Sequence, residues 1–193
     1  MEWIELFLVR YRTLYDFWLG ILWSEVSEDM MRQRPHPRVN SLAWNLWHIA
    51  RVEDSALNRF VADRPQVLDD GDWMEKMALP LRHNGFEMTF EEVDQLNQQI
   101  DLQALRGYSE AIHRRTMEIT TRLKLADLEE ELTRERVELV LIKEGLGSPR
   151  AEGLVENYTG WTKAQCLMNL GLTHSYHHVG EMNVICSLLG LDS

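Results

Sequence analysis

Two histidines near the end of the chain stand four residues apart in a segment with helical periodicity. His174 and His178 would therefore lie on one face of an α-helix, about 40° apart around its axis. The same face carries aliphatic residues before and after the pair: Leu167, Leu170, Ile185 and Leu188. Imidazoles that face a bundle interior need partners, because an unpaired buried polar group costs on the order of a few kcal/mol. A divalent metal would satisfy both, and neutral imidazole suits Zn, Ni, Cu or Fe(II).

A third metal ligand must come from another helix, and His48 is the best placed of the remaining histidines. It lies in mid-helix beside an apolar stripe, close to Trp44 and Trp47. The other histidines are less well placed, between two prolines, in a long loop or at a solvent boundary: His36, His83 and His113. Three histidines leave coordination positions open, which is typical of catalytic zinc sites. The ordinary alternatives are a core histidine at position 48 and a solvent-exposed or capping histidine pair on the last helix.

Glu181 lies seven residues beyond the first of the paired histidines, on the same helix face. It could be a fourth ligand, an acceptor that orients a ligand imidazole, or the partner of a buried arginine, and the second role is favoured. It is also the candidate catalytic residue. His177 points about 100° away from His178 and is expected at the rim of a pocket. The walls of that pocket would include Trp44 and Trp47.

Other catalytic chemistries lack their motifs. The zincin motif His-Glu-x-x-His would need glutamate where Ser175 stands. No Gly-x-Ser-x-Gly sequence occurs, so no serine hydrolase elbow is predicted. The two cysteines, Cys166 and Cys186, lie on an apolar helix and are interpreted as core residues.

Four segments with helical periodicity position these residues, at about 2–25, 40–63, 89–124 and 162–190. The last three open with helix-capping signals, which are Asn40-Ser41, Thr89-x-x-Glu92 and Thr162-x-x-Gln165. The predicted fold is an all-α four-helix bundle with long irregular connections, formed by residues 1–193 as a single domain.

The connections are harder to interpret. Residues 66–88 are predicted to be a long loop with a turn of helix near residues 73–77. Between the third and fourth helices, residues 128–131 look helical and residues 136–142 have the composition of a strand. The glycines and the proline of residues 145–153 predict a loop there.

Composition narrows the class of protein. The 193 residues include 31 acidic and 20 basic side chains, which gives a net charge of −11. That balance disfavours binding to nucleic acid or to an anionic membrane, because both need a basic surface. No run of about 18 apolar residues occurs, and the first residues lack a positively charged signal-peptide start. A cytoplasmic protein is expected.

Residues 41–54 and 160–181 resemble two signatures of the DinB-like superfamily. The first reads SLAWNLWHIARVED, and the second contains GWTK and THSYHHVGE. The resemblance implies a four-helix bundle that holds a divalent metal, often nickel or zinc, through His48, His174 and His178. The sequence departs from the commonest pattern where Val179 and Glu181 replace an arginine and a glutamine. This resemblance spans most of the chain in helix order.

What the resemblance implies for activity is broad, since some members look like S-transferases that use a low-molecular-weight thiol and others like hydrolases. We therefore expect a metal-dependent S-transferase that acts on a small molecule, possesses no reactive thiol of its own and forms a homodimer. One alternative is a hydrolase that uses metal-activated water, with Glu181 as base. The other is a non-catalytic metal-binding dimer scaffold, which exposed aromatic residues on the first helix would favour.

Overall fold

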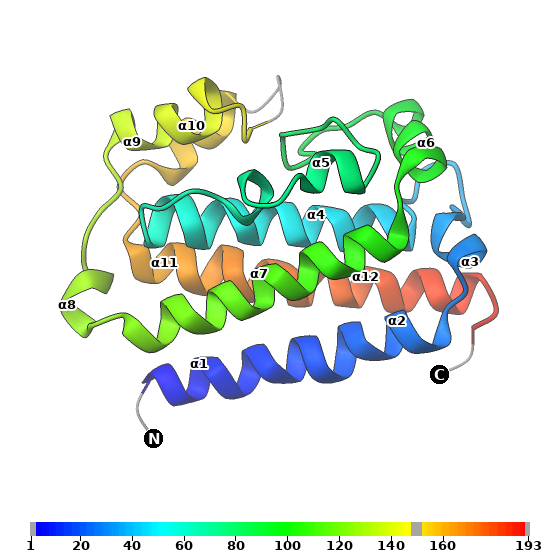
Figure 1. Ribbon diagram of the computed structural model, residues 1–193, viewed down its shortest axis with the longest axis horizontal. Helices are drawn as coiled ribbons and strands as arrows, with labels where there is room; N and C mark the ends of the chain where they lie inside the picture. Colours follow the sequence, from blue (N-terminus) through cyan, green and yellow to red (C-terminus); the bar gives the residue numbers. More distant parts are fainter. Residues whose placement is uncertain (1–2, 148–151, 192–193) are drawn as a thin grey trace.

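The computed structural model describes residues 3–147 and 152–191 and confirms the all-α prediction. Four long helical stretches build a bundle (Figure 1). They are α1 (Trp3–Arg12) with α2 (Gly20–Glu25), α4 (Leu42–Asp54), α7 (Leu102–Arg122), and α11 (Lys163–Met168) with α12 (His174–Leu188). Three π-helical segments extend or join them, at Thr13–Leu19, Ser55–Val61 and Asn169–Thr173. Within the described residues, β-pairing is limited to an isolated bridge between Glu131 and Thr162.

The four stretches run in two directions. In Figure 1, α1–α2 and α11–α12 run from left to right, whereas α4 and α7 run from right to left. Helix α4 packs against α7 and against α12. Helix α1 packs against α7, and the π segment that follows α1 packs against α12. Because α4 and α7 are consecutive and parallel, a long crossover must connect them.

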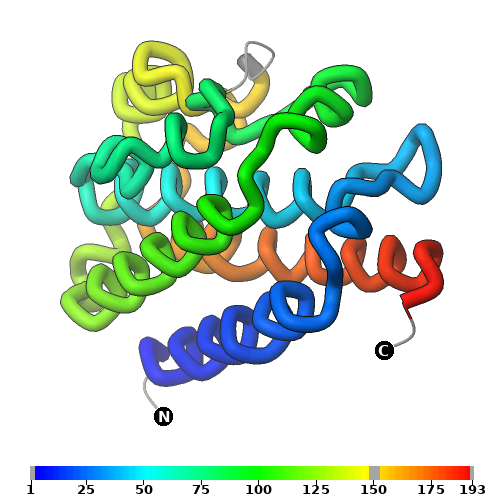
Figure 2. Tube along the Cα trace, turned by 45° about the vertical axis from the view of Figure 1, so that its right-hand side comes forward, coloured from blue at the N-terminus to red at the C-terminus, as the bar shows by residue number. Residues whose placement is uncertain are grey.

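The connections between the four stretches contain the shorter helices. These are α3 (Glu28–Arg32), α5 (Trp73–Lys76), α6 (Phe90–Gln99), α8 (Leu125–Leu128), α9 (Arg134–Glu138) and α10 (Glu152–Tyr158), with a 3-10 turn at Val67–Asp69 and a π segment at Leu139–Lys143. Figures 1 and 2 show α5, α6, α9 and α10 above α4, on the side of the bundle opposite to α1. Within the described residues, no helix has the length and apolar character needed to cross a bilayer.

Helix α4 is the centre of the molecule. It begins as predicted, with the Ser41 hydroxyl accepting a hydrogen bond from the backbone N–H of Trp44 at 2.9 Å. Every residue from 41 to 58 is buried, including Arg51, Glu53 and Asp54. Since charges this deep need partners inside the protein, the elements packed against α4 must supply polar groups to these side chains.

Two buried apolar clusters fill the bundle, one toward each end, and Tyr15 and Tyr176 pack against both. Their largest fully buried side chains include Trp47, Tyr11 and Phe60. Burial of a side chain of this kind stabilises the fold by about 1.5–3 kcal/mol, measured against an exposed one. The clusters therefore hold the helices in place around the polar residues described below.

The predicted single helix over residues 89–124 is wrong in its middle. Helix α6 ends at Gln99, and α7 begins at Leu102 after an extended Ile100 and Asp101. The Asp101 carboxylate accepts a hydrogen bond from the backbone N–H of Ala104 at 2.8 Å, so it caps a new helix.

The strand-like interpretation of residues 136–142 is also wrong. That stretch belongs to α9 and the π segment that follows it. Its aliphatic composition reflects burial of Val137, Val140 and Leu141 against the bundle rather than pairing in a sheet. The predicted loop after residue 145 contains α10 from residue 152 onward, and its residues 148–151 lie outside the described part. The predicted turn of helix near residues 73–77 is confirmed by α5.

Candidate metal centre

The site forms where α4 packs against α12. Gly171 lies in the π segment just before α12, and a Cβ atom there would come 2.9 Å from Leu57 Cδ2. A side chain at this position would displace the buried Leu57, so glycine favours close packing between the π segment that follows α4 and the one that precedes α12. One turn later α12 begins, at His174.

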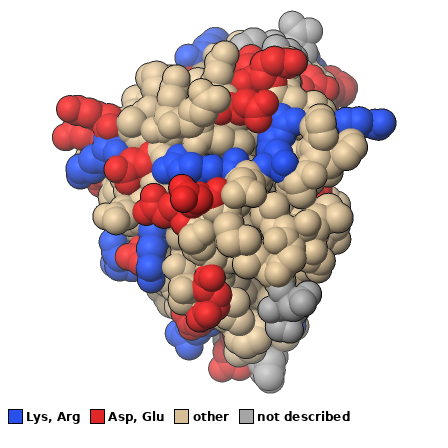
Figure 3. Space-filling model, turned by 90° about the vertical axis from the view of Figure 1, so that its right-hand side faces the viewer, with Lys and Arg blue, Asp and Glu red and all other residues tan. Residues whose placement is uncertain are grey.

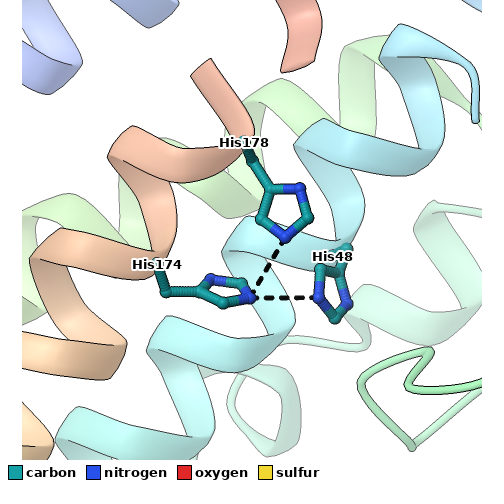
Figure 4. A group of neighbouring side chains, drawn as sticks. All are labelled: His48, His174 and His178. Atoms are coloured by element: carbon teal, nitrogen blue, oxygen red, sulfur yellow. Dashed lines mark hydrogen bonds between the residues drawn. The ribbon is translucent and has the colours of Figure 1, made fainter. Parts of the chain in front are cut away.

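Three imidazoles meet at this crossing, as Figure 4 shows. His48 comes from α4, and His174 and His178 come from α12. The Nε2 atom of His174 lies 3.1 Å from Nε2 of His48 and 3.2 Å from Nε2 of His178. The candidate ligand atoms all lie within 4.8 Å of one another. His48 and His178 are buried, and His174 is partly exposed.

The other ring nitrogens of two of these histidines are held by hydrogen-bond acceptors. Nδ1 of His48 lies against the backbone carbonyl of Asn84. Nδ1 of His178 lies 2.8 Å from Asn45 Oδ1 and 2.8 Å from Glu181 Oε2. Both nitrogens must therefore carry the hydrogen, since their neighbours only accept. In a neutral imidazole the Nε2 atom then presents a lone pair.

In their neutral forms, His48 and His178 therefore direct Nε2 lone pairs toward Nε2 of His174. The Asn45 amide cannot turn its NH₂ group toward His178, because its Nδ2 donates to the backbone carbonyl of Ser41 at 2.9 Å. Burial, followed by the neighbouring imidazoles, lowers the pKa of His48 to about 3 and that of His174 to about 2. Both are thus neutral at pH 7, which is the form that binds a metal. The donor set fits a divalent cation.

Of the predicted pocket residues, the structure brings Trp44 to the cluster. Its indole stacks on His48 with ring centroids 4.6 Å apart and planes 13° from parallel. Trp47 instead is fully buried and packs edge-on against His83. His177 is exposed, and its Nε2 lies 3.1 Å from Glu181 Oε1.

Glu181 lies on the Nδ1 side of His178, away from the Nε2 atoms. Its two oxygens face His177 and His178, and the hydrogen bond with His178 is the largest cause of the lowered pKa of this carboxyl group. Among described residues its ion-pair partners are these two histidines. This geometry favours the orienting role over the other two considered for Glu181.

The sequence did not lead us to predict Asn45 and Asn84 as hydrogen-bond acceptors for the histidines. One feature pointed to Asn45, because a polar residue there interrupts the apolar face of α4 three residues before His48. Asn84 contributes a backbone carbonyl, which any residue type could supply, so its identity carried no signal. Its position depends on Gly85, where φ is +88° and a Cβ atom would lie 2.6 Å from Trp47 Cζ3.

The fold and the site are those of an all-α bundle that holds a cluster of three histidines, two of which are buried. A family model of the DinB superfamily matches residues 19–182, and the chain belongs to that superfamily. A search of curated proteins gives no match. A solved structure similar to this one is described as a conserved protein from Enterococcus faecalis; it is 17% identical, with 97% of each chain covered and a TM-score of 0.73. At that identity the likeness supports the fold alone.

Proposed function

We propose that this protein binds a divalent transition metal, nickel or zinc, through His48, His174 and His178, and that it is an S-transferase. The carrying observation is the convergence of three Nε2 atoms, two of which are fixed as lone-pair donors by their Nδ1 partners. Three protein ligands leave room for an exogenous one. A metal held there would act as a Lewis acid that lowers the pKa of a bound thiol.

The thiol in this proposal comes from outside the chain. Cys166 is buried, and burial raises its pKa to about 12; burial also raises the pKa of Cys186. Neither side chain supplies a thiolate at neutral pH. A low-molecular-weight thiol would form a carbon–sulfur bond with an electrophilic small molecule, whose leaving group departs with the bonding electron pair. The thiol proton passes to solvent.

The chain's own residues orient the ligands and exclude water. Trp44 covers one side of His48, and Asn84, Asn45 and Glu181 fix two imidazole rings. The hydrolase alternative would need Glu181 as a free base, and both of its oxygens are engaged by histidines. This contact supports the transferase over the hydrolase.

Metal analysis and thermal shift test the proposal together. Protein purified without chelator should contain close to one divalent ion per chain, and a binding thiol should raise Tm further, because a ligand specific for the folded state stabilises it. His48→Ala should abolish both effects, whereas His36→Ala, a substitution of an exposed histidine, should leave them intact. Absence of metal, with no Tm change on adding nickel or zinc, would refute metal binding. Metal without response to any thiol would refute the transferase assignment.

A further inference from the structure

A methionine sulfur contacts the indole that covers one side of the candidate metal centre. Trp44 Nε1 donates a hydrogen bond to Met88 Sδ at 3.4 Å. The same indole stacks on the ring of His48 and meets the ring of His178 edge-on, with centroids 4.6 Å and 6.1 Å away. Met88 is therefore separated from two of the three histidines by a single side chain.

Met88 also belongs to the turn that holds the ring of His48. Its backbone N–H donates to the carbonyl of Gly85 at 3.2 Å, and the residue before Gly85 is Asn84, whose own carbonyl faces His48 Nδ1. The sulfur packs closely against this turn, because a Cβ atom on Gly85 would lie 3.2 Å from Sδ. Both groups that hold His48, the indole and the carbonyl, thus border on the same thioether.

A small cavity gives solvent access to the Met88 side chain. It has a volume of about 190 Å³, and its lining includes the exposed Gln95 and Gln99 of α6. A water molecule occupies about 30 Å³ in the liquid, so the cavity can admit hydrogen peroxide, which is little larger. Figure 3 views the end of the bundle at which α6 lies, where acidic and basic side chains are interleaved. Charges of both signs border this approach, which suits an uncharged oxidant.

Four of the other methionines lack this combination of access and position. Met31, Met77 and Met182 are buried, with exposed fractions of 2% or less. Met168 is exposed at 42%, but it lines a groove formed by α1, α8 and α11. Met88 is half-buried, opens onto a cavity and contacts the indole at the metal centre.

We propose that Met88 is a site of reversible oxidation that lowers the affinity of the metal centre. A lone pair of the thioether attacks one oxygen of a hydroperoxide such as H₂O₂, and the S–O bond forms as the O–O bond breaks. The departing hydroxide takes the proton from the new S–OH group, which leaves methionine sulfoxide and water. The sulfur loses two electrons and the peroxide gains them. Methionine sulfoxide reductases restore the thioether, with two thiols as the electron source and a disulfide and water as products.

The added oxygen makes the Met88 side chain larger and polar where it meets Trp44. Because Sδ already lies within hydrogen-bond distance of the indole N–H and close against Gly85, the oxygen fits only if the indole or the turn moves. Either movement loosens His48, and loss of a group that orients a metal ligand typically costs about 10–100-fold in affinity. This consequence rests on the metal binding proposed above, whereas the oxidation itself does not.

Peptide mapping by mass spectrometry follows the reaction in metal-free protein treated with H₂O₂. Met88 should gain oxygen about tenfold faster than Met31, Met77 and Met182, which react only when the fold opens locally. After the peroxide is removed, the Kd for nickel or zinc should rise about tenfold in the wild type. The Tm of the metal-free protein should fall by about 2–4 °C, since a hydrogen bond and part of a ring contact are lost. Met88→Leu, which conserves volume, should show neither change, and Met168→Leu, the matched control, should respond as the wild type does.

Met88→Gln provides a second variant, because its amide oxygen imitates that of the sulfoxide, and it should weaken metal binding without peroxide. Oxidation of Met88 that is no faster than at the three buried methionines overturns the proposal. Equal shifts of Kd and Tm in oxidised wild type and in Met88→Leu overturn it as well. If untreated protein binds neither nickel nor zinc, the metal-binding proposal fails by itself. The oxidation rates and the Tm comparison then still decide whether Met88 is the sensitive site.

Discussion

The Glu181 carboxylate places a negative charge beside the histidine cluster. It lies 2.8 Å from Nδ1 of His178, and the Asn45 amide oxygen shares that nitrogen at the same distance. Asn45 alone would fix the ring and its tautomer, so the contribution of Glu181 is chiefly electrostatic. A negative charge behind an imidazole strengthens its donation to a metal.

Glu181→Gln should therefore weaken nickel or zinc binding by about tenfold, at the lower end of the effect of ligand-orienting residues, because the amide keeps the hydrogen bond and loses the charge. Competition titration against a chelator measures the Kd. His177→Ala is the matched variant, since it removes the other partner of Glu181 at an exposed position. An unchanged Kd in Glu181→Gln, or an equal loss in His177→Ala, would contradict this role.

At the scale of elements, a loop in the α4–α7 crossover holds the ring of His48. Asn84 presents its carbonyl to Nδ1 and donates its own backbone N–H to the carbonyl of Leu146 at 2.9 Å, so the loop is tied to the segment after α9. Gly85 then turns the chain with φ of +88° against the rigid indole of Trp47. The turn tolerates no side chain.

Gly85→Ala should destabilise the protein by about 1–3 kcal/mol, since it combines left-handed backbone strain with a clash against a fully buried ring. It should also weaken metal binding, because the loop can relax only by moving the Asn84 carbonyl away from His48. Urea unfolding and metal titration measure the two effects. Gly145→Ala is the comparison: its φ is also positive, at +70°, but a Cβ atom there meets nothing within 4 Å. Equal effects of both variants would contradict the clash with Trp47.

Sequence periodicity located the four long helices because each buries a regular apolar stripe. It missed the break at Ile100 because Leu96, Ile100 and Ala104 continue the same spacing through the break. The π segment before His174 was also invisible, since one extra residue in a turn leaves no compositional mark. The clustering of the three histidines could be predicted because imidazoles interrupt an apolar stripe. The part played by the Asn84 carbonyl could not, because every residue has a carbonyl.

At the scale of the whole molecule, Glu53 joins three of the four helical stretches at the centre of the bundle. Its carboxylate accepts hydrogen bonds from Tyr11, from Tyr15 at 2.8 Å and from Thr116 at 2.7 Å, which lie on α1, on the following π segment and on α7. No cation partner is found for it among the described residues. Burial, opposed in part by these hydrogen bonds, raises its pKa from 4.5 to about 7.

The contribution of Glu53 to folding stability should therefore fall as pH rises from about 4.5 to 7. Below pH 4.5 Glu53 is protonated in both the folded and the unfolded chain; between 4.5 and 7 the unfolded chain ionises first, and the lost stability reaches about 3 kcal/mol. Glu53→Gln stays neutral at every pH, so this substitution should remove the contribution of Glu53 to the pH dependence of stability. Urea unfolding of both proteins across that range gives the difference between their free energies of unfolding. His48 and His174 contribute with the opposite sign, but they are present in both proteins, so their contribution cancels in this difference. Glu110→Gln, at a half-exposed position, should follow the wild-type curve. Parallel curves for wild type and Glu53→Gln would mean that Glu53 is not protonated in the folded bundle at neutral pH, and that the three hydroxyl groups alone stabilise its charge.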